Sequence, residues 1–345
     1  MRVKLEDVCE RGSSNLKQSD VVEMTGDYPI YGASGYIGNV DFYHQENPYV
    51  AVVKDGAGIG RTTLHPAKSS VIGTMQYLLP KDNVLPKYLY YVVSYMHLEK
   101  YFTGATIPHI YFKDYKNEKF NLDSLEKQKE IVDALGKCDA VIEYRKQELQ
   151  WLDELIKARF VEMFGDPVYN TNDFPIRNLN ELGNWASGGT PSRTVPEYFK
   201  GNIDWYSAGE LNTLFLEGSV EKITEEAIEK SATKLFKAGS LLIGMYDTAA
   251  FKMGILKEDS ASNQACACIT PNDEVNIIWL YYELQMMKEH FLSQRRGVRQ
   301  KNLNLGMIKA FKIPIAKREQ QDEFSDFVKQ VDKSKVTKQI DSHIS

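Results

Sequence analysis

PKDNVLPKYLYY at residues 80–91 recurs without a gap as PNDEVNIIWLYY at residues 271–282. Half of the aligned positions are identical, among them the closing Leu-Tyr-Tyr. After a shift of two residues the match continues, and the glycine, charged and apolar positions of 104–130 return in 297–323. A period of about 190 residues is far longer than the repeats of solenoid proteins. The sequence therefore predicts a duplicated domain, with each copy followed by its own helix.

Each copy is predicted to be a mixed α/β domain, which places the chain in the α/β (α+β) class. Short segments broken by Gly and Pro, such as 28–32 and 49–54, favour β-strands. Apolar residues at helical spacing near 88–101 favour a helix, and a short strand at 120–122 precedes a longer helix. The second copy repeats this order from about 166 to 315.

The longest predicted helix runs from Ser124 to about Gly165. Ser124 is a good N-cap, and Gly165, followed by Asp-Pro, is a typical C-terminal stop. Two heptad rows run along this helix: Gln128, Leu135, Ile142, Leu149 and Ile156 at position a, and Ile131, Cys138, Arg145, Leu152 and Arg159 at position d. These rows favour a coiled-coil seam with one partner helix over a long surface helix.

The helix that follows the second copy, at residues 317–345, is the predicted partner. Phe324, Val328 and Val331 keep the apolar register, which is lost after Val331. Because a duplication relates the two helices by a pseudo-two-fold axis, we expect them to pair antiparallel. Good packing is expected only in the first half of the second helix.

Length and composition exclude several classes of protein. A chain of 345 residues with 43% apolar residues is ordinary for two buried cores and excludes a disordered chain. The longest apolar runs, such as 49–53, are far shorter than the roughly 20 residues of a membrane helix. The first residues, MRVKLED, lack the pattern of a secretory signal. We therefore expect a cytoplasmic protein that does not contact membranes.

The cysteines and the net charge narrow the choice further. Four cysteines fit a reducing compartment. Cys266 and Cys268 have no second Cys or His pair nearby, so buried strand cysteines are favoured over a metal site. The net charge of −5 argues against a chain that binds nucleic acid over its whole surface. Any contact with DNA must come from local basic loops or be shared with a more basic partner.

Motifs of catalytic and cofactor sites are incomplete in the sequence. A phosphate-binding P-loop is absent. The glycines of 55–61 have the wrong spacing for a dinucleotide-binding loop, and the residues that follow are predicted to be extended. Residues 47–49 (NPY) lack the second proline of the Asn-Pro-Pro-Tyr motif of adenine methyltransferases. We therefore expect no active site, no cofactor and no metal.

Three polar loops are candidates for contacts with DNA. In the second copy, residues 187–193 (SGGTPSR) offer N–H groups, hydroxyls and an arginine that suit phosphates. Residues 295–302 (RRGVRQKN) carry four positive charges, and Arg, Gln and Asn are the side chains that read base edges. The equivalent loop of the first copy, 104–109 (GATIPH), carries only His109. A plain turn and a solvated helix end are the alternative interpretations.

The same segments carry a family resemblance, because in order and in duplicate they resemble the specificity subunit of type I restriction-modification systems. The motifs are GTPSR (189–193), YFKGNIDW (198–205), GATIPHI (104–110), EKQKEIV (126–132) and RFVEMFGDP (159–167). The last of these, which closes the first spacer helix, is the most specific. The chain departs from the family where the proline-rich lead-in to the spacers is reduced, and 317–345 holds no counterpart of FGDP.

The resemblance implies a non-catalytic protein that recognises DNA. Residues 1–123 and 166–316 would be target-recognition domains, and 124–165 and 317–345 would be spacer helices. Each domain would read half of a bipartite target in double-stranded DNA. The spacers would dock two methyltransferase subunits, and restriction subunits would join to form a nuclease. A solitary DNA methyltransferase and a coiled-coil adaptor that does not read DNA are the alternatives.

The residues predicted to contact DNA lie in the polar loops and at strand ends. In the first domain they are Tyr31, Ser34, Lys54, Arg61, Thr106 and His109. In the second domain they are Thr190, Ser192, Arg193, Tyr246, Arg295, Arg296, Arg299, Gln300, Lys301 and Asn302. Such residues suit either phosphates or base edges, and the sequence leaves the choice open.

Overall fold

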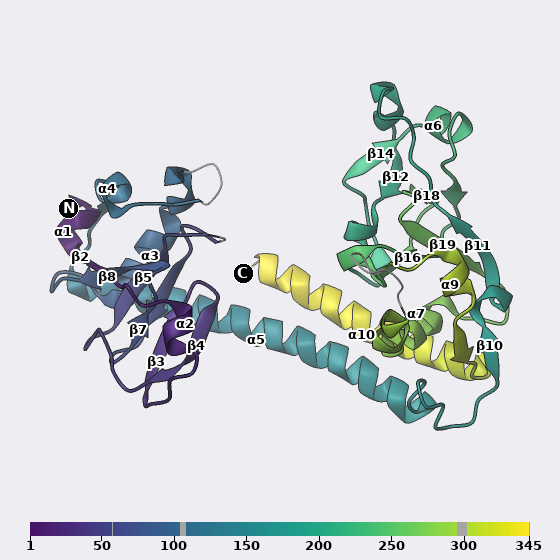
Figure 1. The fold of residues 1–345 in the computed structure, drawn as a ribbon, viewed down its shortest axis with the longest axis horizontal. Helices are drawn as coiled ribbons and strands as arrows, with labels where there is room; N and C mark the ends of the chain where they lie inside the picture. The colour runs from purple at the N-terminus through teal and green to yellow at the C-terminus, as the bar shows by residue number, and fades with distance from the viewer. Residues whose placement is uncertain (57, 104–107, 295–301, 345) are drawn as a thin grey trace. The chain divides into compact units, whose positions relative to one another are not determined.

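The computed structural model describes residues 1–56, 58–103, 108–294 and 302–344, and for 336–344 the backbone alone. Contacts divide the chain into two compact units, Met1–Tyr144 (unit 1) and Arg145–Ser345 (unit 2). Each unit has its own sheets and its own core (Figure 1). Among the described helices, none is both long and apolar enough to cross a membrane.

The described part of unit 1 forms three sheets, with strand orders β2-β8-β5-β6, β4-β3-β7 and β1-β9. The helix α3 covers one face of the first sheet, where Leu89 and Val93 meet Val50 and Leu78. The elements in chain order are β1 (Arg2–Lys4), α1 (Leu5–Val8), β2 (Cys9–Ser13), α2 (Gln18–Val21), β3 (Tyr28–Gly32), β4 (Gly35–Val40), β5 (Tyr49–Val53), β6 (Thr62–His65), β7 (Ser70–Val71), β8 (Met75–Pro80), α3 (Pro86–Tyr95), η1 (Leu98–Tyr101), α4 (Phe112–Tyr115), β9 (Lys119–Asn121) and the start of α5 (Leu125–Phe164).

The described part of unit 2 also forms three sheets, with orders β11-β19-β16-β17-β13, β14-β12-β18-β15 and β10-β20. Its elements after α5 are β10 (Ile176–Asn178), η2 (Leu179–Glu181), β11 (Gly183–Ser187), η3 (Pro196–Phe199), β12 (Ile203–Tyr206), η4 (Ala208–Glu210), β13 (Phe215–Leu216), β14 (Glu221–Ile223), α6 (Glu225–Glu229), β15 (Leu235–Phe236), β16 (Leu241–Gly244), η5 (Asp247–Ala249), β17 (Met253–Leu256), β18 (Ser260–Ser262), β19 (Cys266–Pro271), α7 (Ile277–Met286), α8 (Lys288–Ser293), α9 (Leu305–Lys309), β20 (Lys312–Pro314) and α10 (Arg318–Ile344).

The strand registers confirm the predicted duplication. Val50 pairs with Leu78 in unit 1, and Leu241 pairs with Ile269 in unit 2, which are the same two positions displaced by 191 residues. β5 and β16 are buried along their whole length, and successive residues of each strand face two different apolar clusters. Burial on both faces explains why these strands read as continuous apolar runs in the sequence.

The predicted helix near 88–101 is divided in two. α3 begins with Pro86 in its first turn, where a missing N–H group costs nothing. It ends at Tyr95, and His97 then adopts a left-handed backbone conformation with φ of 52°. The short helix η1 follows separately. The apolar residues that signalled the helix, Leu89 and Val93, are buried as expected.

α5 agrees with its predicted limits to within one residue at each end. The backbone N of Lys127 donates to Ser124 Oγ at 3.3 Å, as expected for an N-cap. Gly165 follows the helix with φ of 72°, a conformation that strains any residue with a side chain.

A buried glutamine joins the start of each long helix to the helix before it. Gln128 Oε1 accepts a hydrogen bond from Leu85 N at 2.9 Å, and Gln321 Oε1 accepts one from Asn276 N at 2.8 Å. Leu85 and Asn276 are the N-cap residues of α3 and α7. The glutamine at an otherwise apolar heptad position therefore satisfies a backbone donor at the start of the neighbouring helix.

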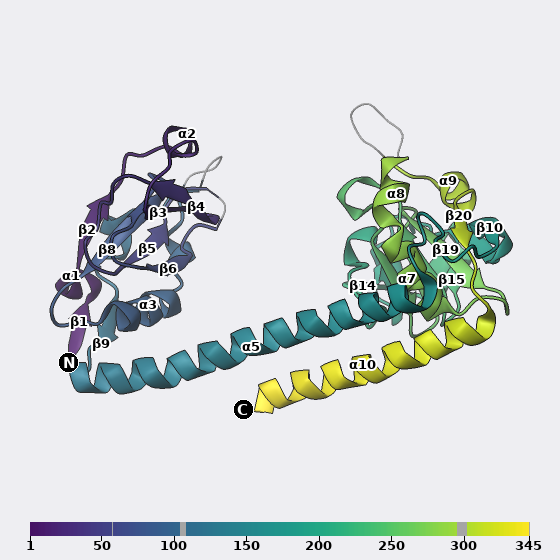
Figure 2. The ribbon, with the colours of Figure 1, turned by 90° about the horizontal axis from the view of Figure 1, so that it is seen from below.

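The second half of α5 packs antiparallel against α10 within unit 2 (Figure 2). Near the end of α5, the ring centroids of Phe164 and Phe324 are 5.7 Å apart. Further back along α5, Asp153 Oδ1 pairs with Lys335 Nζ at 2.5 Å. Because the residue number rises on α10 as it falls on α5, the helices run in opposite directions. The predicted packing of the first half of α10 is confirmed by the fully buried Val328.

The seam extends less far than the heptad rows predict. Leu135 and Ile142, which the rows place in the seam, are 39% and 52% exposed. In the second half of α5, Phe160 takes the buried position that the rows assign to Arg159, which instead forms ion pairs at the surface. In the sequence, the apolar row of α10 ends at Val331. Beyond that residue α10 offers no apolar strip with which α5 could continue the coiled coil.

Three of the four cysteines are buried. Burial raises the pKa of the thiols of Cys9, Cys266 and Cys268 to about 12. Cys266 and Cys268 lie on β19, which confirms the prediction of buried strand cysteines. The fourth, Cys138 on α5, is exposed.

The buried His65 makes the stability of unit 1 depend on pH. Its Nε2 lies 2.7 Å from Thr63 Oγ1, its ring stacks on Tyr49, and burial lowers its pKa to about 4. Above about pH 6.5 the imidazole is neutral in both the folded and the unfolded state, so His65 does not lower the free energy of unfolding there. As pH falls from about 6.5 towards 4, the unfolded state binds a proton first, and folding is disfavoured.

We expect the wild-type chain to lose on the order of 2 kcal/mol more stability between pH 7.5 and pH 5 than the His65→Gln variant, whose side chain does not titrate. Urea unfolding of both proteins at the two pH values measures the difference. An equal loss in both proteins would contradict the assignment.

Candidate nucleic-acid interface

In unit 1, three predicted DNA contacts meet at the end of strand β5. The backbone O of Lys54, directly after β5, accepts from Ile110 N at 3.0 Å. This bond brings His109 to the strand end. Arg61 also lies at this end of β5, because its backbone O accepts a hydrogen bond from Val53 N at 2.9 Å. Arg61 is exposed and Lys54 is half-buried. The predicted contact Thr106 lies outside the described residues.

Asp55 fixes the imidazole of His109. Asp55 Oδ1 lies 2.6 Å from His109 Nδ1, and Lys54 Nζ lies 3.9 Å from the other carboxylate oxygen. A carboxylate accepts hydrogen bonds, so we assign the proton of His109 to Nδ1. With Nδ1 held inward and the side chain 37% exposed, Nε2 is the ring atom available to an external partner.

Unit 2 repeats this arrangement with different side chains. The backbone O of Met245 accepts from Leu303 N at 2.8 Å, which is the counterpart of the bond between Lys54 and Ile110. Asn302 therefore takes the place of His109, and its Oδ1 accepts from Asp247 N at 3.0 Å. The predicted contact Tyr246 stands where unit 1 has Asp55 and is 41% exposed. Five further predicted contacts lie outside the described residues: Arg295, Arg296, Arg299, Gln300 and Lys301.

Two predicted contacts of unit 1 lie on a different sheet from Lys54 and His109. Tyr31 is on β3, where its half-buried ring lies 4.4 Å from the ring of His65 between centroids. Ser34 is exposed in the turn between β3 and β4. No described hydrogen bond or ring contact joins either residue to the strand end, so they form a separate candidate surface.

The loop at 187–193 holds its backbone differently from the expectation. Gly188 N donates to Cys266 O at 3.1 Å, and Gly189 N donates to Ser262 O at 2.9 Å. A Cβ atom at Gly188 would collide with the carbonyl oxygen of Asn263. The glycines allow close packing against β18 and β19, and the expectation that their N–H groups are open to phosphates is wrong.

The predicted contacts Thr190, Ser192 and Arg193 of the same loop are exposed, but their side chains already have partners. The guanidinium of Arg193 lies 4.2 Å from the ring centroid of Phe199, and its Nη2 donates to Glu221 Oε2 at 2.8 Å. Ser192 Oγ lies 2.7 Å from Thr194 Oγ1. Thr190 Oγ1 donates to the side-chain oxygen of Gln264. Arg193 would have to leave Glu221 before it could contact a phosphate.

Sequence reasoning missed two residues of the strand ends. Asp55 was considered only as part of a glycine-rich loop, although the repeat aligns it with Tyr246. Lys252 is the counterpart of Arg61, because its O accepts from Gly244 N at 2.8 Å as the O of Arg61 accepts from Val53 N. The repeat offset of 191 residues, applied along the whole of β5 and the residues after it, is the sequence signal that could have identified Asp55. The same offset of 191 residues aligns Lys252 with Arg61.

Residues 1–154 and 171–345 each match the model of a protein family described as the type I restriction modification DNA specificity domain. The chain belongs to this family. Two specificity domains in one chain agree with the duplication seen in the strand registers. They make the chain a DNA-recognition component of a type I restriction-modification system rather than its catalytic component, which confirms the predicted function and disfavours both alternatives. Within the described residues, no cluster of three His, Cys, Asp or Glu side chains could hold a metal.

Known relatives resemble the specificity chain over most of its length. A type I restriction enzyme specificity subunit of Escherichia coli is 24% identical over 281 residues, 77% of this chain and 68% of the relative. One from Methanocaldococcus jannaschii is 23% identical over 324 residues, 86% of this chain and 75% of the relative. The crystal structure of a type I restriction-modification S subunit from M. genitalium has the same fold, with a TM-score of 0.61, 14% identity, and coverage of 99% of this chain and 92% of that chain.

Proposed function

We propose that the domains at 1–123 and 166–316 each read one half of a bipartite sequence in double-stranded DNA, and that 124–165 and 317–345 are the spacers between them. The duplicated strand end carries this proposal. Equivalent backbone bonds hold His109 in unit 1 and Asn302 in unit 2, so one scaffold presents different side chains. Two readers of different chemistry suit two unrelated half-sites.

The side chains at the strand ends divide by the part of DNA that each suits. Lys54 and Arg61 suit phosphates, because a positive charge holds the backbone without reading a base. Asn302 suits adenine, to which an amide both donates and accepts, and His109 Nε2 suits a single base edge. The basic residues of 295–301 precede Asn302 directly and suit guanine or phosphate. The net charge of −5 is compatible with this function because four positive charges are concentrated in residues 295–301.

We place the docking site of the methyltransferase subunits on the long helices. In unit 2, Trp151 and Leu155 lie one turn apart on α5 and are 58% and 48% exposed. Large exposed apolar side chains are enriched where proteins meet. The duplication favours two methyltransferase subunits, one for each domain, and restriction subunits would complete the nuclease. We expect the assembly to act on DNA in the cytoplasm. The measured mass of the purified assembly gives the number of methyltransferase and restriction subunits.

We expect the isolated chain to transfer no methyl group to DNA, and the chain together with its methyltransferase subunit to methylate adenine within one bipartite motif. Mapping of methylated adenines in DNA from cells that express the chain, the methyltransferase subunit, or both measures this. Methyl transfer by the chain alone would indicate a solitary methyltransferase. Methylation without a defined motif would indicate an adaptor that does not read DNA.

A further inference from the structure

The turn between β18 and β19 lies beside the strand end that holds Asn302. The backbone N of Met245, directly after β16, donates to Ala265 O at 2.9 Å. The backbone O of the same Met245 accepts from Leu303 N at 2.8 Å. The turn and Asn302 are therefore both attached to one residue at the end of β16. Gln264, in the middle of the turn, is exposed.

Both units have this turn, but only unit 2 carries a side chain at its centre. The offset of 191 residues aligns Gln264 with Gly73. Thr74 O accepts from Lys54 N at 3.0 Å, as Ala265 O accepts the equivalent bond in unit 2. A Cβ atom at Gly73 would lie 3.2 Å from two backbone carbonyl oxygens, which leaves little room for a side chain. Unit 2 thus adds a long polar side chain where unit 1 has none.

Thr190 fixes one end of the Gln264 amide. The residue before it, Gly189, is held on both sides, because its N donates to Ser262 O at 2.9 Å and its O accepts from Trp205 Nε1 at 3.0 Å. Thr190 Oγ1 then donates to Gln264 Oε1. The closely packed glycines of this loop therefore place a hydroxyl that orients the amide, and we assign its oxygen to the end that faces Thr190.

The amide of Gln264 keeps the groups that suit adenine. Its Oε1 retains a second lone pair, and no hydrogen bond among the described residues uses the two hydrogens of Nε2. In the major groove, adenine is the base that offers an acceptor, N7, next to a donor, N6, and a Gln amide pairs with both. The hydrogen bond to Thr190 leaves this donor and this acceptor available together.

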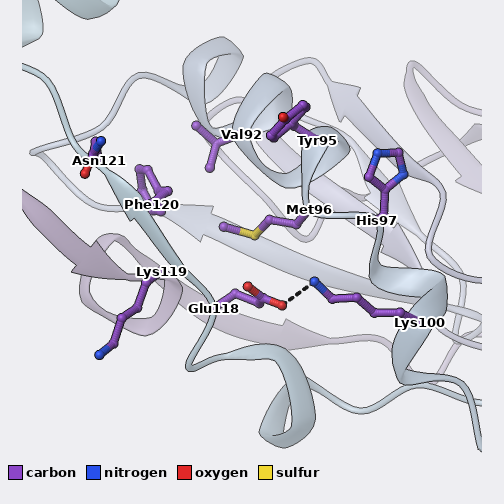
Figure 3. Close-up of a pocket in the computed structure, with 9 residues that line it drawn as sticks. All are labelled: Val92, Tyr95, Met96, His97, Lys100, Glu118, Lys119, Phe120 and Asn121. Atoms are coloured by element: carbon purple, nitrogen blue, oxygen red, sulfur yellow. Dashed lines mark ion pairs between the residues drawn. The ribbon is translucent and has the colours of Figure 1, made fainter.

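Four cavities formed by described residues are lined by other side chains. The larger of two in unit 1, of about 650 Å³, lies between the end of α3, η1 and β9, where Figure 3 shows Met96 above the ion pair of Lys100 and Glu118. The two in unit 2, of about 630 and 410 Å³, are lined largely by α5, α7 and α10 and by β12, β14 and β18. Neither Thr190 nor Gln264 lines any of the four. An exposed amide outside these pockets suits the edge of a base in a duplex groove.

We propose that Gln264 reads adenine at one position of the half-site recognised by unit 2, and that Thr190 positions its amide. This inference rests on the proposal that the strand ends read DNA. It adds a second base-reading side chain beside Asn302 and adds none to unit 1. It also gives the predicted contact Thr190 a role that needs no contact with DNA.

The test uses the full chain assembled with its methyltransferase subunit and maps the methylated motif. Gln264→Ala should weaken the preference for an A·T pair at one position of one half-site by roughly 5- to 150-fold, with all other positions unchanged. Asn272→Ala is the matched control, because this exposed amide follows β19 as Gln264 precedes it. The motif of the control should equal that of the wild type.

Three further variants separate reading from mere support of the loop. Gln264→Glu still accepts from Thr190 but cannot donate to adenine N7, so the same position should lose its preference although the contact within the protein remains. Thr190→Val removes the hydroxyl and should weaken the preference at that position by roughly 2- to 10-fold, the worth of one neutral hydrogen bond. Thr190→Ser, which returns a hydroxyl, should restore it.

The outcomes distinguish this inference from the proposed function. Relaxation of one position by Asn302→Ala, with an unchanged motif for Gln264→Ala, would overturn the role of Gln264 and leave the strand ends as readers. An unchanged motif in both variants would overturn both. An unchanged motif for Gln264→Glu would make the residue a support of the loop. Weaker binding to all sequences alike would make it a phosphate contact, and relaxation at a G·C pair would exclude adenine, so each of these results would also overturn the inference.

Discussion

Replacement of Phe160 by Asp is expected to lower the free energy of unfolding of unit 2 by about 4 kcal/mol or more. The ring is fully buried and lies 5.0 and 5.3 Å from those of Phe164 and Phe324 between centroids. The change therefore removes an aromatic side chain from the contact between α5 and α10 and leaves a carboxylate there without a partner.

Val161→Asp is the matched control, because the next residue on the same turn is 45% exposed and should tolerate the charge within about 0.5 kcal/mol. Ile142→Asp should be as mild, although the heptad rows place Ile142 in the seam, because that side chain is 52% exposed. Urea unfolding followed by circular dichroism measures all three variants. Equal stability of Phe160→Asp and Val161→Asp would refute the antiparallel packing.

The second large effect concerns the DNA sequence that is read. In the assembled methyltransferase, His109→Ala should relax the preference at one position of one half-site, and Asn302→Ala should do so in the other half-site. Loss of a base-reading side chain costs about 1–3 kcal/mol at its position, so a single base preference should weaken by roughly 5- to 150-fold. Maps of the methylated motif for each variant measure the change.

Each unit serves as the control for the other, because the half-site read by the unaltered unit should stay the same. Arg296→Ala and Arg299→Ala, made singly, distinguish base readers from phosphate contacts among the residues before Asn302. Replacement of a base-reading side chain relaxes the preference at one position. Replacement of a phosphate contact weakens binding to all sequences and lowers the slope of log affinity against log salt concentration by about one. Relaxation of both half-sites by one variant would show that the strand ends do not read DNA separately.

The features that could be predicted from the sequence depend on neighbours along the chain. The ends of α5 follow from a Ser124 cap and a Gly165 stop that act within a few residues. The duplication follows from identities that need no knowledge of contacts. The exposure of Ile142 was not predictable in this way, because a heptad row describes one helix and says nothing of how far its partner continues the apolar strip.

The interface was harder to predict because distant segments decide it. Gly188 and Gly189 form a loop that suits phosphates, but their N–H groups are taken by Cys266 and Ser262. Arg193 is likewise engaged by Phe199 and Glu221. In contrast, the equivalence of His109 and Asn302 was predictable, because they lie at the same place in two copies of one repeat, and the backbone bonds beside them agree with that alignment.

The uneven burial of the cysteines gives the native chain a single point of attachment for thiol chemistry. Cys9, Cys266 and Cys268 are shielded, and burial keeps their thiols protonated at neutral pH, so a maleimide should react at Cys138 alone. Cys138 lies one turn along α5 from Leu135. An environment-sensitive dye on this residue would therefore sit beside the exposed Leu135, and its emission would report whether another helix packs on this part of α5 in an otherwise unaltered protein.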